Sequence, residues 1–171
     1  MRILKIVIRI LGLLVFIFLL TGLFIKKVDY EVVVEVEKPL EETWTLFNDH
    51  TIMDQWVKGV KSFDPIEENE SMVGNKYRMI VEDQGREVEM IETITAWVPN
   101  EKVGMQFEAG EMFKENDIRF AFENGKTVIT NDASCAGTTY LTKCMFPYFK
   151  SMFKKIDQEM LDDFKSMAEK I

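Results

Sequence analysis

The spacing of turn residues between Val60 and Ala136 leaves few folds open to this chain. Six segments in this region are rich in β-branched and aromatic residues and are bounded by turn signals, so each predicts a strand. They are Val60 to Glu68, Lys76 to Asp83, Arg86 to Trp97, Lys102 to Glu108, Met112 to Glu123 and Lys126 to Ala136. The connections contain Gly74-Asn75, Gln84-Gly85, Pro99-Asn100, Ala109-Gly110 and Asn124-Gly125. Connections this short exclude crossover helices and predict an antiparallel meander, with Asn124-Gly125 as the strongest hairpin signal.

A further strand and two short helices are predicted before the meander. Every second residue of this strand is apolar, namely Tyr30, Val32, Val34 and Val36. The positions between them hold Glu31, Val33 and Glu35, so the pattern has a period of two. Pro39 suits the first position of a helix whose Leu40, Trp44 and Phe47 share one face. Thr51 and Asp54 have the spacing of a capping box, which predicts a second short helix that carries Met53 and Trp56 inward.

A long amphipathic helix is predicted from about Tyr140 to the end of the chain. One apolar stripe recurs at helical spacing and contains Met145, Phe149, Met152, Phe153, Ile156, Met160, Phe164, Met167 and Ile171. Pro147 either lies in the first turn of this helix or kinks it. A seven-stranded antiparallel sheet that curls round one long helix would be an α+β fold.

The N-terminal segment predicts a membrane anchor. Residues 10–25 are sixteen residues without a charge, and they reach roughly 24 Å as a helix, which spans a bilayer if Arg9 and Lys26 snorkel. A secretory signal peptide is the alternative, although no A-x-A-like cleavage site follows. We therefore expect an anchor over residues 1–27 and one soluble domain over residues 28–171. The slight excess of basic residues before the run favours a cytoplasmic N-terminus and an extracytoplasmic domain.

Charge argues against nucleic acid as a partner. Residues 28–171 hold 16 basic and 29 acidic side chains, a net charge of −13, so the domain as a whole would repel phosphate backbones and anionic headgroups. A single His and the lack of an H-E-x-x-H motif argue against a metal site, and no nucleotide or serine-hydrolase fingerprint indicates a cofactor or that chemistry. His50 is expected to be solvated or capping. Cys135 and Cys144 are either two free thiols or a disulfide across the strand-to-helix corner.

Three polar side chains are candidates for proton chemistry or for orienting a ligand. Glu92 shares a strand face with Met90 and Ile94, where desolvation would raise its pKa, unless a bulge at residues 90–91 reverses the faces and puts Glu92 in water. Asp132 either contacts a ligand or lies on the sheet surface. Tyr140 either contacts a ligand or caps the last helix against the core.

The chain resembles the SRPBCC superfamily, which includes START lipid-transfer domains, birch-pollen-type allergens and polyketide cyclase/dehydrase proteins. VVVEVEKPLEETWTLFNDHTIMDQWV (Val32 to Val57) resembles the strand-Pro-helix opening of this superfamily, with Pro39 and Trp56 at the matching positions. MIETITAWVPNEKVGMQF (Met90 to Phe107) resembles its central hairpin. The resemblance implies a helix-grip fold over residues 28–171 with an apolar cavity between sheet and helix, and only some members are enzymes.

A cavity of this kind would be lined by thioethers and aromatic rings that adapt to apolar guests. The expected lining residues are Trp56, Met79, Met90, Ile94, Met105, Phe107, Phe120, Phe122, Met145, Phe149, Met152, Phe153 and Ile156. The leading hypothesis is a membrane-anchored binding domain for a hydrophobic small molecule or lipid. One alternative is a cyclase or dehydratase that uses Glu92, Asp132 or Tyr140 to move protons. Another is a protein-interaction module of the chaperone-activator kind, whose acidic surface would select a basic partner.

Overall fold

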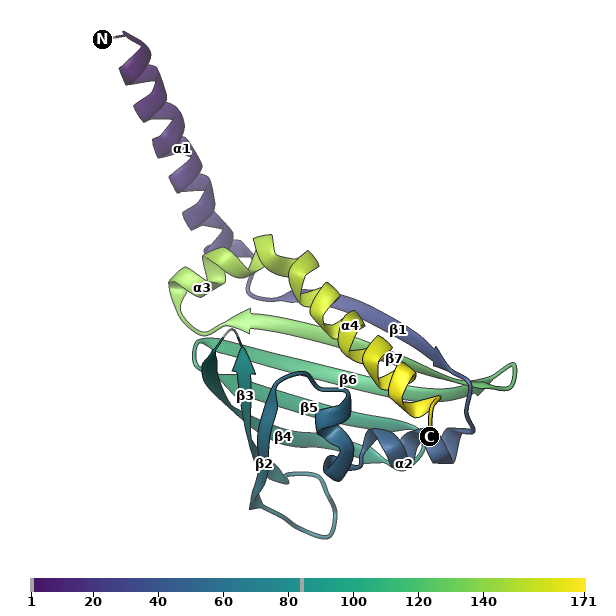
Figure 1. Ribbon diagram of the computed structural model, residues 1–171. Coiled ribbons are helices and arrows are strands. Elements are labelled where there is room, and N and C mark those ends of the chain that lie inside the picture. Colours follow the sequence, from purple (N-terminus) through teal and green to yellow (C-terminus); the bar gives the residue numbers. More distant parts are fainter. Residues whose placement is uncertain (1, 84) are drawn as a thin grey trace.

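A computed structural model describes residues 2–83 and 85–171 and contains one curved antiparallel sheet (Figure 1). Gln84, which belongs to one predicted turn, lies outside the described residues. The sheet has seven strands in the order β1-β7-β6-β5-β4-β3-β2. Their bounds are β1 Val28–Val36, β2 Val60–Glu67, β3 Lys76–Asp83, β4 Arg86–Val98, β5 Lys102–Ala109, β6 Met112–Glu123 and β7 Lys126–Gly137. The predicted meander is confirmed, and each strand end agrees with its predicted position to within one residue.

Local chemistry explains the sheet. Asn124 and Gly125 both have positive φ, at 52° and 83°, as the two central residues of a type I′ turn require. This turn sets the register between β6 and β7, in which Glu123 pairs with Lys126. β1 pairs with β7 on its other side, and its side chains alternate between buried and exposed along the whole strand. The alternation leaves the apolar side chains of β1, except Val33, on the concave face of the sheet.

The two short helices follow β1, as predicted, but their first residues differ from the prediction. The first is α2, Leu40–Phe47, and Pro39 is its N-cap residue rather than its first helical residue. The second is the 3-10 helix η1, His50–Gln55, which is capped by Asp49 and not by Thr51. Asp49 accepts a hydrogen bond from the Thr51 backbone N–H at 2.9 Å, because the carboxylate one residue before the helix reaches the free amides of the first turn.

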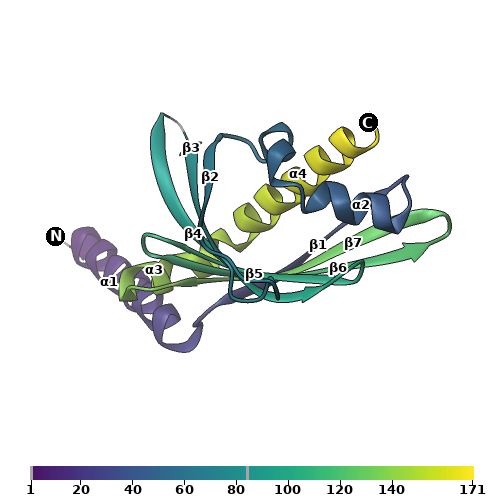
Figure 2. The same ribbon diagram turned by 90° about the horizontal axis from the view of Figure 1, so that it is seen from below.

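The C-terminal region is not one continuous helix. It consists of α3 Tyr140–Met145, the 3-10 helix η2 Phe146–Phe149, and α4 Lys150–Ala168. Pro147 lies in η2, where it separates α3 from α4. Figure 2 shows α4 lying across the concave face of the sheet, with β2 and β3 rising beside it. The predicted α+β helix-grip architecture is therefore correct, with a break at its last corner.

The packed core lies beneath the C-terminal half of α4. Phe47 contacts Phe164 and Phe120 edge-to-face, with ring centroids 5.1 and 5.3 Å apart, and Trp44 meets Phe120 at 5.0 Å. Interlocking aromatic rings of this kind fill the space between helix and sheet at this end. Near the start of α4 the packing is different, because large apolar side chains there are exposed: Phe149 by 40%, Met152 by 45% and Ile156 by 54%.

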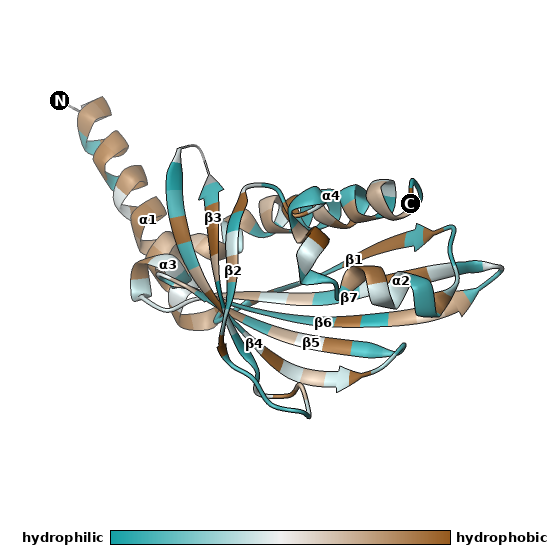
Figure 3. Ribbon diagram, turned by 60° about the horizontal axis from the view of Figure 1, so that its bottom comes forward, coloured by the Kyte–Doolittle hydropathy of each residue, from teal (hydrophilic) through white to brown (hydrophobic). Residues whose placement is uncertain are grey.

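The helix α1, Arg2–Phe24, projects from the body and contacts it only near its C-terminal end (Figures 1 and 3). Residues Ile3–Phe24 are long and apolar enough to cross a membrane, a property that signal sequences share. The last turns of α1 lie against α3: the Tyr140 hydroxyl donates to the Leu19 carbonyl at 2.6 Å, and the Thr21 hydroxyl donates to the Cys144 carbonyl at 3.1 Å. Gly22 makes this approach possible, because a Cβ there would lie 2.5 Å from the Cys144 sulfur.

Candidate functional site

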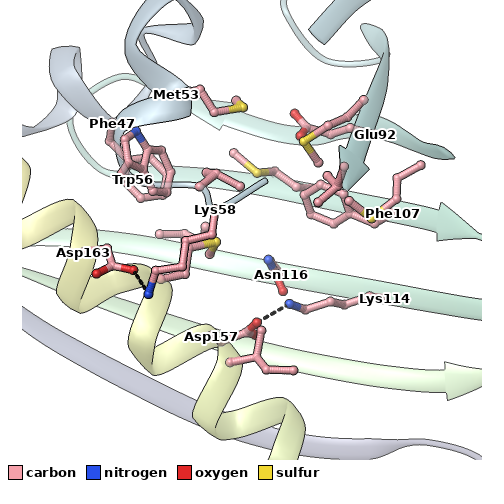
Figure 4. Close-up of a pocket in the computed structure, with 18 of the residues that line it drawn as sticks. Phe47, Met53, Trp56, Lys58, Glu92, Phe107, Lys114, Asn116, Asp157 and Asp163 are labelled. Carbon is pink, nitrogen blue, oxygen red and sulfur yellow. Dashed lines mark hydrogen bonds and ion pairs between the residues drawn. The ribbon is translucent and has the colours of Figure 1, made fainter. Parts of the chain in front are cut away.

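An open cavity of about 330 Å³ lies between the sheet and the middle of α4, beside the aromatic core. Its walls come from β3, β4, β5 and β6 on one side and from α4 and η1 on the other (Figure 4). The lining residues are Phe47, Asn48, His50, Met53, Trp56, Val57, Lys58, Met79, Val81, Met90, Glu92, Met105, Phe107, Met112, Lys114, Asn116, Ile118, Ile156, Asp157, Glu159, Met160 and Asp163. The cavity exists because the aromatic rings that fill the core do not extend this far along α4.

Six methionines supply most of the flexible lining. They come from six different elements and are Met53, Met79, Met90, Met105, Met112 and Met160. An unbranched thioether changes rotamer at little cost, and its sulfur is polarisable, so such walls adapt to guests of different shape. The rings of Phe47, Trp56 and Phe107 add rigid apolar surface. The cavity is thus suited to an apolar molecule.

Glu92 is a buried carboxyl group on this apolar wall. Its side chain is only 3% exposed, and desolvation raises its pKa to about 7, because burial penalises the charged form. Residues 90 to 93 of β4 pair with β3 without interruption. The register shift of β4 against β5 comes later, between Ile94 and Ala96. The bulge considered at residues 90–91 is therefore wrong, and the inward-facing alternative is the one observed.

A buried ion pair forms the opposite side of the cavity. The Lys114 ammonium on β6 lies 2.5 Å from Asp157 Oδ1 on α4, and the Tyr30 hydroxyl on β1 donates to Asp157 Oδ2 at 2.8 Å. Asp157 is 2% exposed, so its charge is compensated by these two donors rather than by solvent. Burial and the adjacent carboxylate raise the pKa of Tyr30, which keeps this phenol a hydrogen-bond donor. The network fixes α4 to the sheet at the cavity.

Strand register places the two ionisable groups in one row. Glu92 pairs with Phe107, and Phe107 pairs with Lys114, so the three side chains point to the same face on adjacent strands. Two strand spacings separate Glu92 from Lys114, which is roughly 10 Å. The Phe107 ring lies between them, as Figure 4 shows. A guest above Phe107 would therefore have the Glu92 carboxyl group on one side and a compensated ammonium on the other.

Apart from Asp163 Oδ2, which is ion-paired with Lys58, two polar atoms on the cavity wall are buried without a hydrogen-bond partner among residues 2–83 and 85–171. They are Asn116 Oδ1 and Trp56 Nε1. Buried polar atoms are usually paired, since an unpaired one costs about 1–3 kcal/mol. An acceptor and a donor left open on the wall of a cavity are the groups that a ligand's polar atoms would satisfy.

The rim is polar. Lys58, in the loop after η1, forms an ion pair of 2.6 Å with Asp163 on α4 and so closes part of the opening (Figure 4). His50 was expected to be solvated or capping, but its half-buried ring packs on Phe63 and Tyr77 with centroids 4.4 and 5.1 Å apart. Desolvation lowers the pKa of His50, which favours the neutral imidazole at the cavity.

The structure places part of the predicted lining on the cavity wall. Those found there are Trp56, Met79, Met90, Met105, Phe107 and Ile156. Ile94 and Phe120 belong instead to the closed core, and Phe122 lies near the end of β6 with 54% exposure. The remaining four lie before or at the start of α4 and are absent from the described cavity wall: Met145, Phe149, Met152 and Phe153.

Two of the polar candidates lie elsewhere. Asp132 forms an exposed ion pair with Arg119, which makes it the sheet-surface acid of the two alternatives. Tyr140 neither reaches the cavity nor caps α3 against the core; Thr139 is the cap, and the Tyr140 hydroxyl bonds to α1. Cys135 and Cys144 are both buried free thiols. Among the residues that the structure describes, no group of three or more His, Cys, Asp or Glu side chains is arranged to hold a metal ion.

Sequence reasoning missed the polar side of the cavity. Asp157 carried a signal, because it precedes Leu161 and Phe164 by four and seven residues, and these define the buried face of α4. Lys114 and Asn116 have the same parity along β6 as Ile118 and therefore face inward. Charged and amide side chains on a core-facing pattern were the available indication of this cluster.

Comparison with solved structures shows the same fold in proteins of low sequence identity. Ara h 8.0201 has a TM-score of 0.66 at 10% identity, covering 85% of this chain and 99% of its own. A conserved protein from Geobacillus kaustophilus has a TM-score of 0.67 at 17% identity, covering 84% and 96%. The di-domain ARO/CYC protein StfQ of the steffimycin biosynthetic pathway has a TM-score of 0.68 at 13% identity, covering 85% of this chain and 51% of its own.

Comparison with protein families identifies a family, whereas the solved structures show the fold alone. No curated protein matches the sequence. The family described as activator of Hsp90 ATPase homolog 1-like protein matches residues 37–166, from the end of β1 to near the end of α4. The match includes strands β2 to β7 and every residue of the cavity wall described above, but not α1 or β1. Because it covers well over half of the sequence, the chain belongs to this family and has the SRPBCC-type helix-grip fold.

Proposed function

We propose that this protein is a membrane-anchored binding protein that holds an apolar small molecule in the cavity between its sheet and α4. Residues 1–27 would form the anchor and residues 28–171 the binding domain. The observation that carries the proposal is the open, methionine-lined cavity of about 330 Å³ next to an otherwise closed aromatic core. A core selected only for stability would fill this space, because cavities cost free energy in proportion to their volume.

The cavity chemistry restricts the ligand. Its volume lies at the lower end of the ~300–1,000 Å³ typical of pockets for drug-sized molecules. Affinity would come from apolar area removed from water, about 25 cal/mol per Å², before ordering costs. Asn116 Oδ1 and Trp56 Nε1 offer one acceptor and one donor. Burying a charged group against these apolar walls would cost desolvation free energy, so we propose a neutral ligand with one or two hydrogen-bonding groups.

Native mass spectrometry of the full chain, released from detergent micelles, tests this proposal. The wild-type chain is expected to carry a bound molecule of defined mass. Met105→Trp adds bulk in the middle of the cavity wall and is expected to remove it. Phe122→Trp introduces the same side chain at an exposed position beyond the cavity and should leave occupancy unchanged. Equal occupancy in both variants would assign the bound molecule to another site and contradict the proposal.

The proposed topology places the N-terminus in the cytoplasm and the domain outside it. It rests on three basic residues before the apolar run against two after it. A membrane-impermeant maleimide should label an exposed Ser166→Cys in intact cells, because Ser166 lies on the outer face of α4. Labelling only after lysis would show that the domain lies in the cytoplasm. Release of residues 28–171 from the membrane would identify a cleaved signal sequence.

An enzyme of the cyclase or dehydratase kind is the second candidate, and Glu92 favours it. A carboxyl group with a pKa of about 7 inside an apolar cavity can both donate and accept a proton near neutral pH. Glu92→Gln separates the two functions: a binding protein should keep its ligand, whereas an enzyme should bind and no longer convert it.

The family name also raises the third alternative, a chaperone activator, which would act through its surface. The open cavity favours a bound ligand over that alternative.

A further inference from the structure

One stretch of the domain has the opposite charge to the rest. The seventeen residues from Tyr140 to Ile156 contain four lysines and no acid, although residues 28–171 carry a net charge of −13. The expectation that the domain repels anionic headgroups describes its average and not this stretch. The stretch consists of α3, η2 and the first two turns of α4, and we call it the basic apolar face.

The basic apolar face also exposes large apolar side chains close together. The exposed ones are Tyr140, Leu141, Tyr148, Phe149, Met152 and Ile156. The other exposed large apolar side chains among the described residues of the domain are scattered singly over several strands and loops. Three of its lysines have no carboxylate within 4.0 Å in the described part of the chain, namely Lys143, Lys150 and Lys154, and Lys155 has only Glu159 at 3.6 Å. These charges are free to meet an external anion.

The basic apolar face is continuous with α1. Tyr148 stacks on Phe18 with ring centroids 6.0 Å apart, and the Tyr140 hydroxyl bonds to the Leu19 carbonyl. Phe18 lies six residues before the end of α1 at Phe24, which is about 9 Å along a helix. If α1 spans a bilayer, these contacts hold α3 and η2 at the depth of the headgroups and the first acyl carbons. Figure 1 shows α3 and the start of α4 gathered at the base of α1.

We propose that the basic apolar face docks on a bilayer surface that contains anionic lipid headgroups. Amphipathic segments with aromatic rings on one side and lysines on the other lie in the interface in this way, the rings among the headgroups and the ammonium groups on lipid phosphates. Ile156 belongs both to this face and to the cavity wall. Docking therefore brings the cavity to the lipid surface, whether or not the cavity holds a ligand.

Depth measurements on the full chain in vesicles test the docking. The chain is reconstituted in phosphatidylcholine vesicles with one third phosphatidylglycerol, and a nitroxide is attached at Ser151→Cys, within the face. Ser166→Cys, exposed on the far end of the same helix, is the matched control. The unsubstituted chain, whose two thiols are buried, gives the background labelling. The label at 151 should collide with oxygen several-fold more, relative to a water-soluble nickel complex, than the label at 166. Equal ratios at the two positions would overturn the proposal.

Charge reversal tests the part played by anionic headgroups. In one variant three lysines of the face become glutamate, at Lys150, Lys154 and Lys155. In a control variant of equal charge the same change is made on the sheet, at Lys61, Lys76 and Lys102. The first variant should lose the oxygen preference at 151 in anionic vesicles and the second should retain it. Equal effects would overturn the assignment to anionic lipid, and an unchanged bound mass in the mass spectrum would leave the cavity proposal standing.

Discussion

Replacement of Glu92 by Gln should stabilise the protein at high pH. The Glu92 carboxyl group is 3% exposed and carries a pKa of about 7, against an ordinary value of 4.5. The difference of about 2.5 units corresponds to about 3 kcal/mol at 1.36 kcal/mol per unit. Glutamine has nearly the same shape and cannot ionise, so Glu92→Gln should raise the free energy of unfolding by about that amount at pH 8.

The sign follows from proton binding in the two states. Between pH 4.5 and 7 the folded protein keeps the Glu92 proton while the unfolded chain has released it, so stability falls as pH rises. The stabilisation is complete below pH 4.5 and is lost as pH rises through 7. Above pH 7 the effect of Glu92 on the free energy of unfolding no longer changes with pH. The advantage of the Gln variant should therefore grow from pH 5 to pH 8 and then level off.

Denaturant unfolding of the full chain in detergent micelles, followed by tryptophan fluorescence, measures this difference. Glu87→Gln is the matched control, because Glu87 is exposed on the same strand. The control should show the same small difference from wild type at pH 5 and at pH 8. If the advantage of Glu92→Gln were also equal at the two pH values, the pKa of Glu92 would lie near its ordinary value and its carboxyl group would be hydrated. The cavity would then be wet, and the argument for a neutral apolar ligand would fail.

Three other outcomes are expected. Lys114→Met should cost about 3–5 kcal/mol in unfolding experiments by leaving the Asp157 carboxylate buried and unpaired, and adding Asp157→Leu should recover most of the loss. Gly22→Leu should push α1 away from α3, because even a Cβ would lie 2.5 Å from the Cys144 sulfur, and maleimide labelling of Cys144 should become several-fold faster. Asp132→Asn should change stability by less than about 1 kcal/mol and leave ligand occupancy in the mass spectrum unchanged, since its ion pair is exposed.

The fold was predictable because its signals are local. The alternation in β1 and the Asn124-Gly125 turn each depend on a few neighbouring residues, and together the turn signals determine a meander. The predicted helix starts were wrong by one or two residues. Asp49 and Thr51 are both good capping residues, and only the backbone path decides between them. The same applies to Pro147, for which the sequence allowed a first-turn position or a kink.

The site was predictable in part. Strand alternation identifies which side chains face α4, but not where along the strand the helix leaves a space; Phe120 and Met105 face the same way, yet one is core and the other cavity. On α4 the buried face runs through Asp157 and Leu161, so Met152 fell outside it. Asp157 was missed because the cavity wall was predicted from apolar side chains alone. A buried acid of this kind depends on a partner from a distant strand, here Lys114, which the sequence does not place beside it.

The short connection between α1 and β1 limits how the domain can work. Only three residues separate Phe24 from Val28, so the edge strand starts at most about 14 Å from the end of the helix. If α1 is retained in a bilayer, a domain on so short a tether cannot shuttle cargo between membranes. It would exchange molecules with the leaflet directly beside it or with neighbours diffusing in the same plane, and its effective concentration would be set by membrane area rather than by cell volume.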